Sequence, residues 1–599
     1  MTDILSRRDL QFLLHEWLDV GRLAGRDRFD GQSPQDWDDV LDLAAQIAAD
    51  RFAPHNRKAD ANEPTVGEDG RVVLIPEVAE ALEVFNETGL IAASMDQEVG
   101  GMGLPYTVTA GIFSWLHAAN VGTAAYQMLT AGAANLLISQ GSPEQIETWV
   151  EPMLEGRFYG TMCLSETQAG SSLADIATKA VPQGDGSYRL FGSKMWISAG
   201  EHELGENIVH LVLAKVPGAP AGSRGISLFV VPRLLLDEDG GIGERNDVSL
   251  AGINHKMGFR GTVNTVLGFG EGEHRPGGEA GAIGYLVGEE NKGLAGMFHM
   301  MNEARIGVGL GAGAIGYTAY LKAVRYARER PQGRPLADGK DQTTPQVPII
   351  EHADVKRMLL AQKSYVEGAL ALNLYCAGLV DEQASAPEEA ERDRAGLLLE
   401  ILTPIAKSWP SQWCLEANSL AIQVHGGYGY AREYDVEQHY RDNRLNAIHE
   451  GTHGIQAMDL LGRKVTMKGG AAFGALYETV AATVARAGEA GGEAAELGER
   501  LERSLARLAE VTGILWADRD PEVALPNATV YLEAAGHVVI AWAWLEQFLA
   551  AAGEEGDFYD GKRQAARYFF RFELPRTGPQ LDLLASLDDT TRAMEDAWF

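Results

Sequence analysis

The order of apolar and polar residues changes character twice along the chain. Up to about residue 160, apolar residues recur mostly every three or four positions, as in 37–52 and 76–90, which predicts amphipathic helices. Between roughly 161 and 290 the apolar runs become short, rich in β-branched and aromatic residues, and separated by glycine and proline. That pattern predicts an antiparallel β-domain between two helical regions.

The helical pattern then returns for the rest of the chain. Long runs cover 318–330 and 401–425, and the stretch 331–348, rich in proline, glycine and polar residues, predicts a loop. A later Ala- and Glu-rich region predicts further helices with a flexible connection at 489–498. We therefore expect a mostly helical α+β protein with four consecutive domains: an N-terminal helical domain (1–160), a central β-domain (161–290), a helical bundle (291–465) and a C-terminal helical extension (466–599).

Composition and charge narrow the class of protein. The 599 residues are 45% hydrophobic and 23% charged, which is ordinary for a soluble globular enzyme. A formal net charge of −33 disfavours nucleic acids and anionic membranes as partners, because their phosphate groups must be neutralised by Lys and Arg. Cys163, Cys376 and Cys414 lie far apart, which fits a reducing compartment. No apolar signal region follows Arg7-Arg8 and no run approaches 18 uncharged apolar residues, so we expect a cytoplasmic protein without a membrane span.

One five-residue motif allows two different interpretations. Residues 449–453, His-Glu-Gly-Thr-His, match the H-E-x-x-H pattern of zinc peptidases. A zinc peptidase needs both histidines on one continuous helix and a further ligand downstream. Gly451 and Gly454 make a poor helix interior, and no histidine follows until His537. The other interpretation is a single carboxylate, Glu450, that acts as a base beside a flavin.

Other chemically suggestive segments are weak when each is taken alone. The G-x-G-x-x-G pattern at 311–316 follows a stretch with helical character, so close helix–helix packing is a better interpretation than nucleotide binding. The polar turn after Cys163, the segment around Trp196 and the glycines after His425 also have ordinary structural explanations. Their order and spacing along the chain are more informative than any one of them.

Together these segments resemble the acyl-CoA dehydrogenase family over roughly residues 75–465. The resemblance rests on CLSETQAGSS (163–172), GSKMWISAG (192–200), GFRGTVNTVLGFG (258–270), NEARIGVGLGAGAIGYTAYLKAVRYARER (302–330), QVHGGYGYAREYDVEQHYRD (423–442) and AIHEGTHGIQ (447–456). It implies a flavoprotein with a helical domain, a β-barrel domain and a helical bundle, with FAD as the cofactor and an acyl-CoA as the substrate. No metal is expected.

The resemblance also implies a mechanism. Glu450 matches the family's base, which removes the α-proton of the thioester while hydride leaves Cβ for flavin N5. A carboxylate whose pKa is raised by desolvation suits that task. Some relatives carry the base just before the arginine of the long helix, but Ala304 stands there in this chain. The residues expected to contact the acyl-CoA are Ser171, Asn302, Arg305 and Gly451, whose N–H group would help to hold the thioester carbonyl.

The FAD-binding residues implied by the resemblance come from two regions. In the β-domain they are Leu164, Ser165, Gly170, Ser171, Trp196 and Ser198, beside the isoalloxazine and ribityl groups. In the helical bundle they are Arg330 and Gln332 for the pyrophosphate, Gln423, Gly426 and Gly427 for the adenosine half, and Thr452. In this family the groups for the adenosine half belong to a neighbouring subunit, so we expect a homodimer or a dimer of dimers, with electron-transfer flavoprotein as an example of the electron acceptor.

The chain departs from the family pattern at several of these positions. Ser165 and Ser198 stand where threonine is common, and the aromatic residue of E-R-x-x-F-G is missing from 329–333. His449 replaces a tyrosine before the base, and Gly454 replaces a glutamine that contacts the flavin. These changes affect the expected contour of the active site.

The C-terminal extension bears on the substrate and on rival functions. It carries 12 basic and 22 acidic residues, a net charge of −10, which disfavours attachment to membranes or DNA. Among larger family members, the chain most resembles the 3-methylmercaptopropionyl-CoA dehydrogenases, which implies that thioester as the candidate substrate and ordinary fatty acyl-CoA as the alternative. A DNA-binding flavoprotein of the same fold and the zinc peptidase are the alternatives from other classes.

Overall fold

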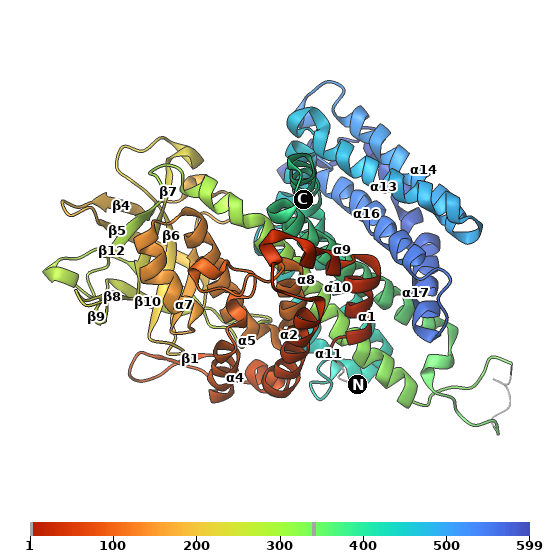
Figure 1. Cartoon of the computed structure of the whole chain (residues 1–599), viewed down its shortest axis with the longest axis horizontal. Helices are drawn as coiled ribbons and strands as arrows, with labels where there is room; N and C mark the ends of the chain where they lie inside the picture. The colour runs from red at the N-terminus through yellow and green to blue at the C-terminus, as the bar shows by residue number, and fades with distance from the viewer. Residues whose placement is uncertain (1–3, 338–342) are drawn as a thin grey trace. The chain divides into compact units, whose positions relative to one another are not determined.

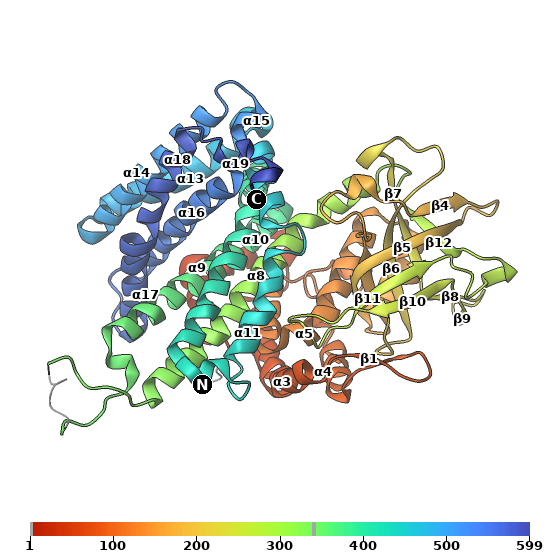
Figure 2. The ribbon, with the colours of Figure 1, turned by 180° about the vertical axis from the view of Figure 1, so that it is seen from behind.

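The computed structural model describes residues 4–337 and 343–599, with the backbone alone for 295 and 298–301. Part of the predicted loop 331–348 therefore lies outside the described residues. The chain forms two compact units, of which unit 1 comprises Met1–Asp36 and Arg305–Phe599 and unit 2 comprises Trp37–Ala304. Figures 1 and 2 show the elements of both from opposite sides.

The helical part of unit 2 packs around one long apolar helix, α5 (Tyr106–Gln140). This helix is buried over most of its length and is interrupted at Asn120, whose φ is −164°. A helix that is apolar on all sides is expected at the centre of a domain. The shorter elements of this part are α2 (Pro34–Ile47), α3 (Asn56–Ala61), α4 (Pro76–Glu87), α6 (Pro143–Gln145), α7 (Glu151–Leu154) and the hairpin β1 (Thr65–Val66) and β2 (Val72–Val73).

The β-part of unit 2 is built on an eight-stranded sheet with the order β10-β11-β5-β12-β7-β6-β3, in which β4 pairs with β5 and β6. Its strands are β3 (Phe158–Cys163), β4 (Lys179–Pro182), β5 (Tyr188–Ser198), β6 (Asn207–Lys215), β7 (Ile226–Pro232), β10 (Val248–Ile253), β11 (Asn264–Phe269) and β12 (Ala282–Val287), and a separate hairpin contains β8 (Leu234–Leu236) and β9 (Ile242–Arg245). The predicted antiparallel arrangement is wrong for two pairs, because β3 and β4 each run parallel to β6. Strand β6 is buried at every position but its last, and burial on both faces is typical of strands with parallel neighbours.

Unit 1 is built on the long helices α8 (Gly293–Glu329), α9 (Ala353–Ser385) and α10 (Glu389–His425), the first of which continues from unit 2. A side chain at Gly309 would overlap the carbonyl group of Ala406, and a Cβ at Gly316 would lie 2.8 Å from Cβ of Cys414. The glycines of α8 therefore permit close contact with α10, and the helix-packing interpretation of the glycine pattern is confirmed.

The C-terminal helices of unit 1 surround α16 (Ala528–Ala550). This helix is long and apolar enough to cross a membrane, but 83% of its most apolar window is buried inside the protein. Its neighbours include α13 (Ala471–Ala490), α14 (Gly492–Leu515), α17 (Asp557–Tyr568) and α18 (Thr577–Ala585). The predicted flexible connection at 489–498 is wrong, because only Gly491 separates two helices, and it has a positive φ of 70° that suits a sharp turn.

The first 36 residues belong with unit 1, although the sequence places them in the N-terminal domain 1–160. Asp9 of α1 (Arg7–Gln11) is buried, forms an ion pair with the buried Lys562, and accepts a hydrogen bond from the hydroxyl group of Tyr317 at 3.0 Å. The ring of Phe12 packs against Phe558 at 5.5 Å. A buried carboxylate needs such partners, and here they come from distant parts of the sequence.

Candidate active site

A β-bulge presents an aromatic side chain on the sheet of unit 2. Between Lys194 and Ile197, β5 contains one residue more than the facing stretch of β11. Trp196 lies in this bulge with a left-handed backbone (φ 66°), and 59% of the residue is exposed. Strained backbone and exposed aromatic surface together are typical of a ligand-binding position rather than of core packing.

The loop after β3 is fastened to the same strand by a buried ion pair. Lys194 donates a hydrogen bond to the carbonyl oxygen of Leu164 at 3.1 Å, and its ammonium group lies 3.0 Å from Glu166. The side chains of the pair are 0% and 4% exposed. Burial alone would raise the pKa of Glu166, but the charge of Lys194 and hydrogen bonds from Thr178 and the Ala177 N–H group lower it to about 2. The pair therefore holds this loop with the carboxylate ionised.

Four of the predicted flavin contacts are brought together by these connections. The N–H group of Met195 donates to the carbonyl oxygen of Ser165 at 2.9 Å, which joins the loop to the bulge. The hydroxyl group of Ser198 accepts a hydrogen bond from Asn264 at 3.0 Å. Leu164, Ser165, Trp196 and Ser198 thus occupy connected positions at the ends of β3 and β5. Gly170 and Ser171 lie on the exposed part of the same loop, where a Cβ at Gly170 would meet nothing within 4 Å.

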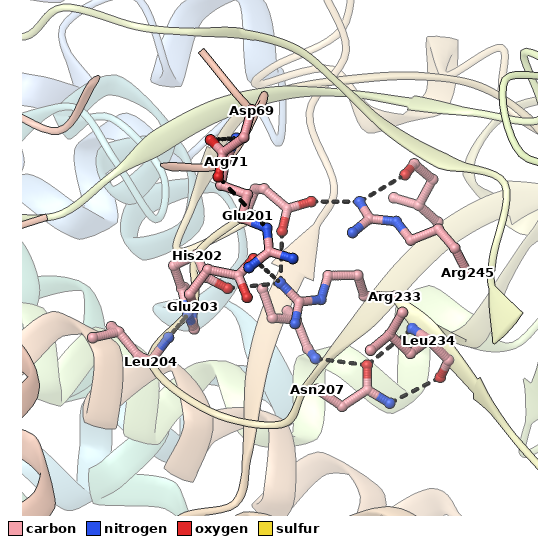
Figure 3. Close-up of polar contacts among 12 residues, drawn as sticks. Asp69, Arg71, Glu201, His202, Glu203, Leu204, Asn207, Arg233, Leu234 and Arg245 are labelled. Atoms are coloured by element: carbon pink, nitrogen blue, oxygen red, sulfur yellow. Dashed lines mark hydrogen bonds and ion pairs between the residues drawn. The ribbon is translucent and has the colours of Figure 1, made fainter. Parts of the chain in front are cut away.

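The segment that follows Ser198 is fixed by the charge cluster shown in Figure 3. Glu201 is buried and accepts hydrogen bonds from Arg233 at 2.8 Å and from Arg245 at 2.6 Å. Arg233 also donates to the carbonyl oxygen of His202 at 2.7 Å. Two guanidinium groups on one carboxylate restrain the exit from β5, and hence the position of the strand that bears Trp196.

In unit 1, Glu450 lies in a tight loop and not on a helix. Helix α12 (His453–Asp459) begins only after Thr452, whose hydroxyl group caps it by accepting a hydrogen bond from the Ile455 N–H group at 3.4 Å. The backbone of Glu450 is left-handed, with a φ of 51°, and that of Gly451 has a φ of 86°. The motif at 449–453 therefore lacks the continuous helix that a zinc peptidase requires. No group of three or more metal-ligating side chains occurs in the described part of the chain.

The electrostatic surroundings of Glu450 suit a base. Although part of Glu450 is accessible to solvent, the surrounding protein desolvates the carboxyl group and raises its pKa, and the positive charges of Lys407 and Arg305 oppose that rise. Burial lowers the pKa of Lys407 to about 7. Burial also lowers the pKa of His449 to about 3, which keeps this imidazole neutral at physiological pH.

Arg305 and Asn302, predicted to contact the acyl-CoA, have different surroundings. Arg305 is 4% exposed and its guanidinium group lies 2.7 Å from Asp459. Asn302 is half-buried and belongs to unit 2. Glu303, one residue away from the alternative position for a base, accepts a hydrogen bond from Asn135 at 3.4 Å. The carboxylate of Asp459 is therefore a direct partner of Arg305 within unit 1. The contacts of Asn302 and Arg305 with the substrate stay predictions.

A pocket of about 560 Å³ in unit 1 collects most of the predicted contacts to the nucleotide half of FAD. Its lining comprises Tyr326, Arg330, Gln332, Ile349, Val424, His425, Gly426, Gly427, Tyr428 and Ala431. The guanidinium group of Arg330 lies over the ring of Tyr428, 5.5 Å from its centroid. A Cβ at Gly426 or Gly427 would meet nothing within 4 Å, so the backbone there is open to approach. Gln423 is exposed but is not one of the lining residues.

Family models match four consecutive stretches of the chain. The acyl-CoA dehydrogenase N-terminal, middle and C-terminal domains match 35–157, 161–269 and 339–465, and the acetyl-CoA dehydrogenase C-terminal-like model matches 476–595. A 3-methylmercaptopropionyl-CoA dehydrogenase of Ruegeria pomeroyi is 39% identical to this chain over 88% of it and 89% of the relative. The chain belongs to the acyl-CoA dehydrogenase family.

Similarity to other members of the family extends over the whole chain. A broad-specificity linear acyl-CoA dehydrogenase of Mycobacterium tuberculosis is 32% identical over 99% of both chains. The structure of an acyl-CoA dehydrogenase complexed with FAD from Bacillus anthracis has the same fold, with a TM-score of 0.73 and 19% identity over 93% of this chain and 90% of that one. The predicted fold class is thereby confirmed, and this acyl-CoA dehydrogenase is a flavin-dependent oxidoreductase with FAD as its cofactor.

The described residues fit that cofactor in both units. The pocket of unit 1 combines a guanidinium group with open glycine backbone, which is the chemistry that a pyrophosphate requires. On unit 2, β5 carries the exposed Trp196 in its bulge and the hydroxyl group of Ser198 just after it, which suits a flat ring with polar edges.

The motifs do not reveal the roles of several residues that shape the site of this acyl-CoA dehydrogenase. Lys407 and Gln456 are buried and donate hydrogen bonds to backbone carbonyl groups around Glu450, and the carbonyl group of the buried Asn446 is one of the two that Lys407 binds. A lysine inside the apolar run 401–425 is the one available signal, because a buried lysine needs a partner. Nothing in the sequence pattern identifies which carbonyl groups that partner would be.

Proposed function

We propose that this acyl-CoA dehydrogenase converts an acyl-CoA thioester to the 2-enoyl-CoA, with Glu450 as the base that removes the α-proton. The observation that supports the proposal most strongly is the placement of Glu450. Part of the residue is accessible to solvent, desolvation by the surrounding protein raises the pKa of its carboxyl group, and its backbone is held in a left-handed conformation. A carboxylate with a raised pKa is a stronger base than an ordinary one.

The proposed reaction breaks two C–H bonds of the substrate. The proton on Cα passes to a carboxylate oxygen of Glu450, and the pair of electrons left on Cα forms the new double bond as hydride leaves Cβ. Bound FAD would supply the acceptor for that hydride. The N–H group of Gly451 is our candidate donor to the thioester carbonyl, whose polarisation stabilises the negative charge that develops as the proton departs. Ser171, Asn302 and Arg305 are the other candidate contacts to the acyl-CoA.

Each unit by itself carries candidate contacts to a different part of the cofactor. On unit 2, Leu164, Ser165, Gly170, Ser171, Trp196 and Ser198 are the candidates for the isoalloxazine and ribityl groups. On unit 1, Arg330, Gln332, Gly426 and Gly427 share the pocket that suits the pyrophosphate and adenosine groups. Gln423 and Thr452 are further candidates, although Thr452 already caps α12.

We also propose that the enzyme works as a homodimer or a dimer of dimers, in which the nucleotide pocket of one subunit serves the flavin of its neighbour. Two exposed tyrosines support a subunit contact there: Tyr428, which lines the pocket and is 48% exposed, and Tyr430, two residues further along the chain and 90% exposed. Large exposed aromatic side chains are enriched in protein–protein interfaces. We further propose that the enzyme is located in the cytoplasm.

The candidate substrate is 3-methylmercaptopropionyl-CoA. The relative from Ruegeria pomeroyi supports this choice through its name and its 39% identity. Ordinary fatty acyl-CoA is the alternative, supported by a butyryl-CoA dehydrogenase of Syntrophomonas wolfei that is 34% identical over 100% of this chain and 99% of the relative. Electron-transfer flavoprotein is the proposed acceptor, since a subunit of the caffeyl-CoA reductase–Etf complex of Acetobacterium woodii is 30% identical over 64% of this chain and 89% of the relative.

Anaerobic titration with a panel of thioesters tests the function and the substrate together. The purified yellow protein is mixed with 3-methylmercaptopropionyl-CoA, butyryl-CoA and longer acyl-CoAs, and the visible absorbance of the flavin is recorded while the 2-enoyl product is measured by mass spectrometry. We expect bleaching of the flavin in proportion to the 2-enoyl product formed. Among the thioesters tested, 3-methylmercaptopropionyl-CoA should bleach the flavin fastest. A protein that no acyl-CoA bleaches, or one that is colourless and loaded with zinc, would refute the proposal.

A further inference from the structure

One buried ammonium group joins both ends of the segment that carries Glu450, here called the Glu450 loop (residues 446–451). Lys407 lies in the middle of α10 and is 0% exposed. Its Nζ atom donates one hydrogen bond to the carbonyl oxygen of Asn446 and another to that of Gly451, each at 2.7 Å. These two residues are the first and last of the loop, so a single side chain fixes the distance between its ends.

A chain of buried amide side chains holds the first end of the Glu450 loop independently. Asn446 donates through its side chain to Asn443 at 3.0 Å, and Asn443 donates to Asn418 of α10 at 2.7 Å. The Oδ1 atom of Asn446 can only accept, so His449 donates to it from Nε2 at 2.9 Å. Both the side chain and the carbonyl group of Asn446 are therefore occupied by partners.

The backbone at the second end needs such support. Glu450 is left-handed (φ 51°) although it is not glycine, which is an unfavourable conformation for a side-chain-bearing residue. The carbonyl oxygen of Glu450 accepts a hydrogen bond from Gln456 at 3.0 Å, and the next carbonyl group along the chain is the one that Lys407 binds. Strained backbone of this kind persists only where neighbouring groups determine it.

We propose that Lys407 is a positioning residue for the dehydrogenation, which ties the ends of the Glu450 loop together and keeps the Glu450 carboxylate near its own positive charge. This inference rests on the proposed function of Glu450 as the base. In this role, Lys407 does not touch the reacting atoms. It acts by holding the base in place and by favouring its ionised form.

The other charged groups around the Glu450 loop differ from Lys407 in their partners. The titratable and charged groups that interact with the loop or with its charged neighbours include Arg305 on α8, Glu400 on α10, Arg444 beside Asn446, His449 within the loop, His453 and Asp459 on α12, and Lys464 after α12. Arg305 is paired with Asp459, and Lys464 with Glu400. Both hydrogen bonds of Lys407 go to neutral carbonyl groups, so among the described residues its charge acts on Glu450 without an ion-pair partner of its own.

Three variants of the full-length holoenzyme test the inference. Lys407→Met removes the charge and both donors, Lys407→Arg keeps the charge but changes the shape of the donor, and Lys464→Met removes a buried lysine of the same region that does not bond to the loop. For each, FAD content is measured, and the rate of flavin reduction by a saturating acyl-CoA is followed by stopped flow from about pH 5 to about pH 9. The substrate concentration for half-maximal rate is measured as well.

We expect Lys407→Met to retain FAD and substrate affinity but to reduce its flavin about 10²-fold more slowly, the size of effect that a small misplacement of a catalytic group produces. Loss of the positive charge raises the pKa of Glu450, so the acidic limb of the rate profile moves to higher pH. For Lys407→Arg, the acidic limb of the rate profile should stay at the wild-type pH, while the rate of flavin reduction falls about tenfold. Lys464→Met should stay within about twofold of the wild type, as expected for an independent site.

A Lys407→Met enzyme with the wild-type rate and an unchanged pH profile would overturn the inference while leaving the proposed function intact. If Lys407→Met does not fold, Lys407→Arg decides: a lowered rate with an unmoved acidic limb supports the role, and a fully wild-type rate overturns it. If acyl-CoA fails to bleach the wild-type flavin, both the proposed function and the role of Lys407 fall.

Discussion

Replacing Gly451 by alanine probes the geometry that holds Glu450. The backbone of Gly451 is left-handed, with a φ of 86°, and an added Cβ would lie 2.7 Å from Nε2 of Gln456. The glutamine must therefore move, and its hydrogen bond to the carbonyl oxygen of Glu450, 3.0 Å long, would be lost. A left-handed alanine costs about 1–2 kcal/mol and a lost hydrogen bond about 0.5–1.5 kcal/mol. We predict that Gly451→Ala loses about 2–3 kcal/mol of unfolding free energy in unit 1.

The assay compares Gly451→Ala with Gly454→Ala, a matched control three residues away. Gly454 lies in α12, where a Cβ would meet only the hydroxyl group of Thr452 at 3.8 Å, so alanine there should leave stability unchanged or raise it by up to about 1 kcal/mol. Urea unfolding followed by circular dichroism gives the free energies, and stopped flow gives the rate of flavin reduction. A Gly451→Ala protein as stable as the wild type, with the wild-type rate, would refute the described geometry of the loop.

Three further predictions concern the cofactor-binding regions. Lys194→Met leaves Glu166 buried without its cation and should cost about 3–5 kcal/mol of stability, together with loss of FAD, measured by urea unfolding and flavin content; a stable, fully yellow variant would contradict it. Because the folded pKa of Glu166 is about 2, below its ordinary value of 4.5, its contribution to stability is present above pH 4.5 and is lost as the pH falls toward 2. As the pH falls from 4.5 toward 2, the unfolding free energy of the wild type should therefore decline more steeply than that of Lys194→Met. Arg330→Ala should weaken FAD binding roughly 10- to 100-fold by removing a charged hydrogen-bond donor; flavin fluorescence on dilution measures it, and unchanged affinity would exclude this pocket as the pyrophosphate site.

The fold could be predicted from the sequence wherever the pattern was local. The spacing of apolar residues in 318–330 and 401–425 reports directly on helix faces. The short apolar runs of the central region likewise predicted strands where β3, β5, β6, β7, β8 and β11 form. The glycines of 311–316 were interpretable because the residues before them are helical. The connection at 489–498 was misjudged, since alanine and glutamate on both sides of Gly491 continue the helices up to a single-residue break.

Features that depend on distant partners were not predictable. The placement of residues 1–36 in unit 1 rests on Asp9, whose partner Lys562 lies near the opposite end of the chain. In the candidate site, the resemblance indicated Glu450, Trp196 and Arg330, but not the side chains that hold them. Those are selected by three-dimensional packing, and a lone Lys407 in an apolar run shows only that a partner must exist.

Glu450 is the proposed base, and its replacement by glutamine isolates that role. Glutamine keeps the size of the side chain but cannot accept the α-proton. We predict that Glu450→Gln binds FAD and acyl-CoA like the wild type, while anaerobic reduction of its flavin by the acyl-CoA is about 10²- to 10⁴-fold slower. Bleaching of the Glu450→Gln flavin at the wild-type rate would show that Glu450 is not the base and would place the base on another residue.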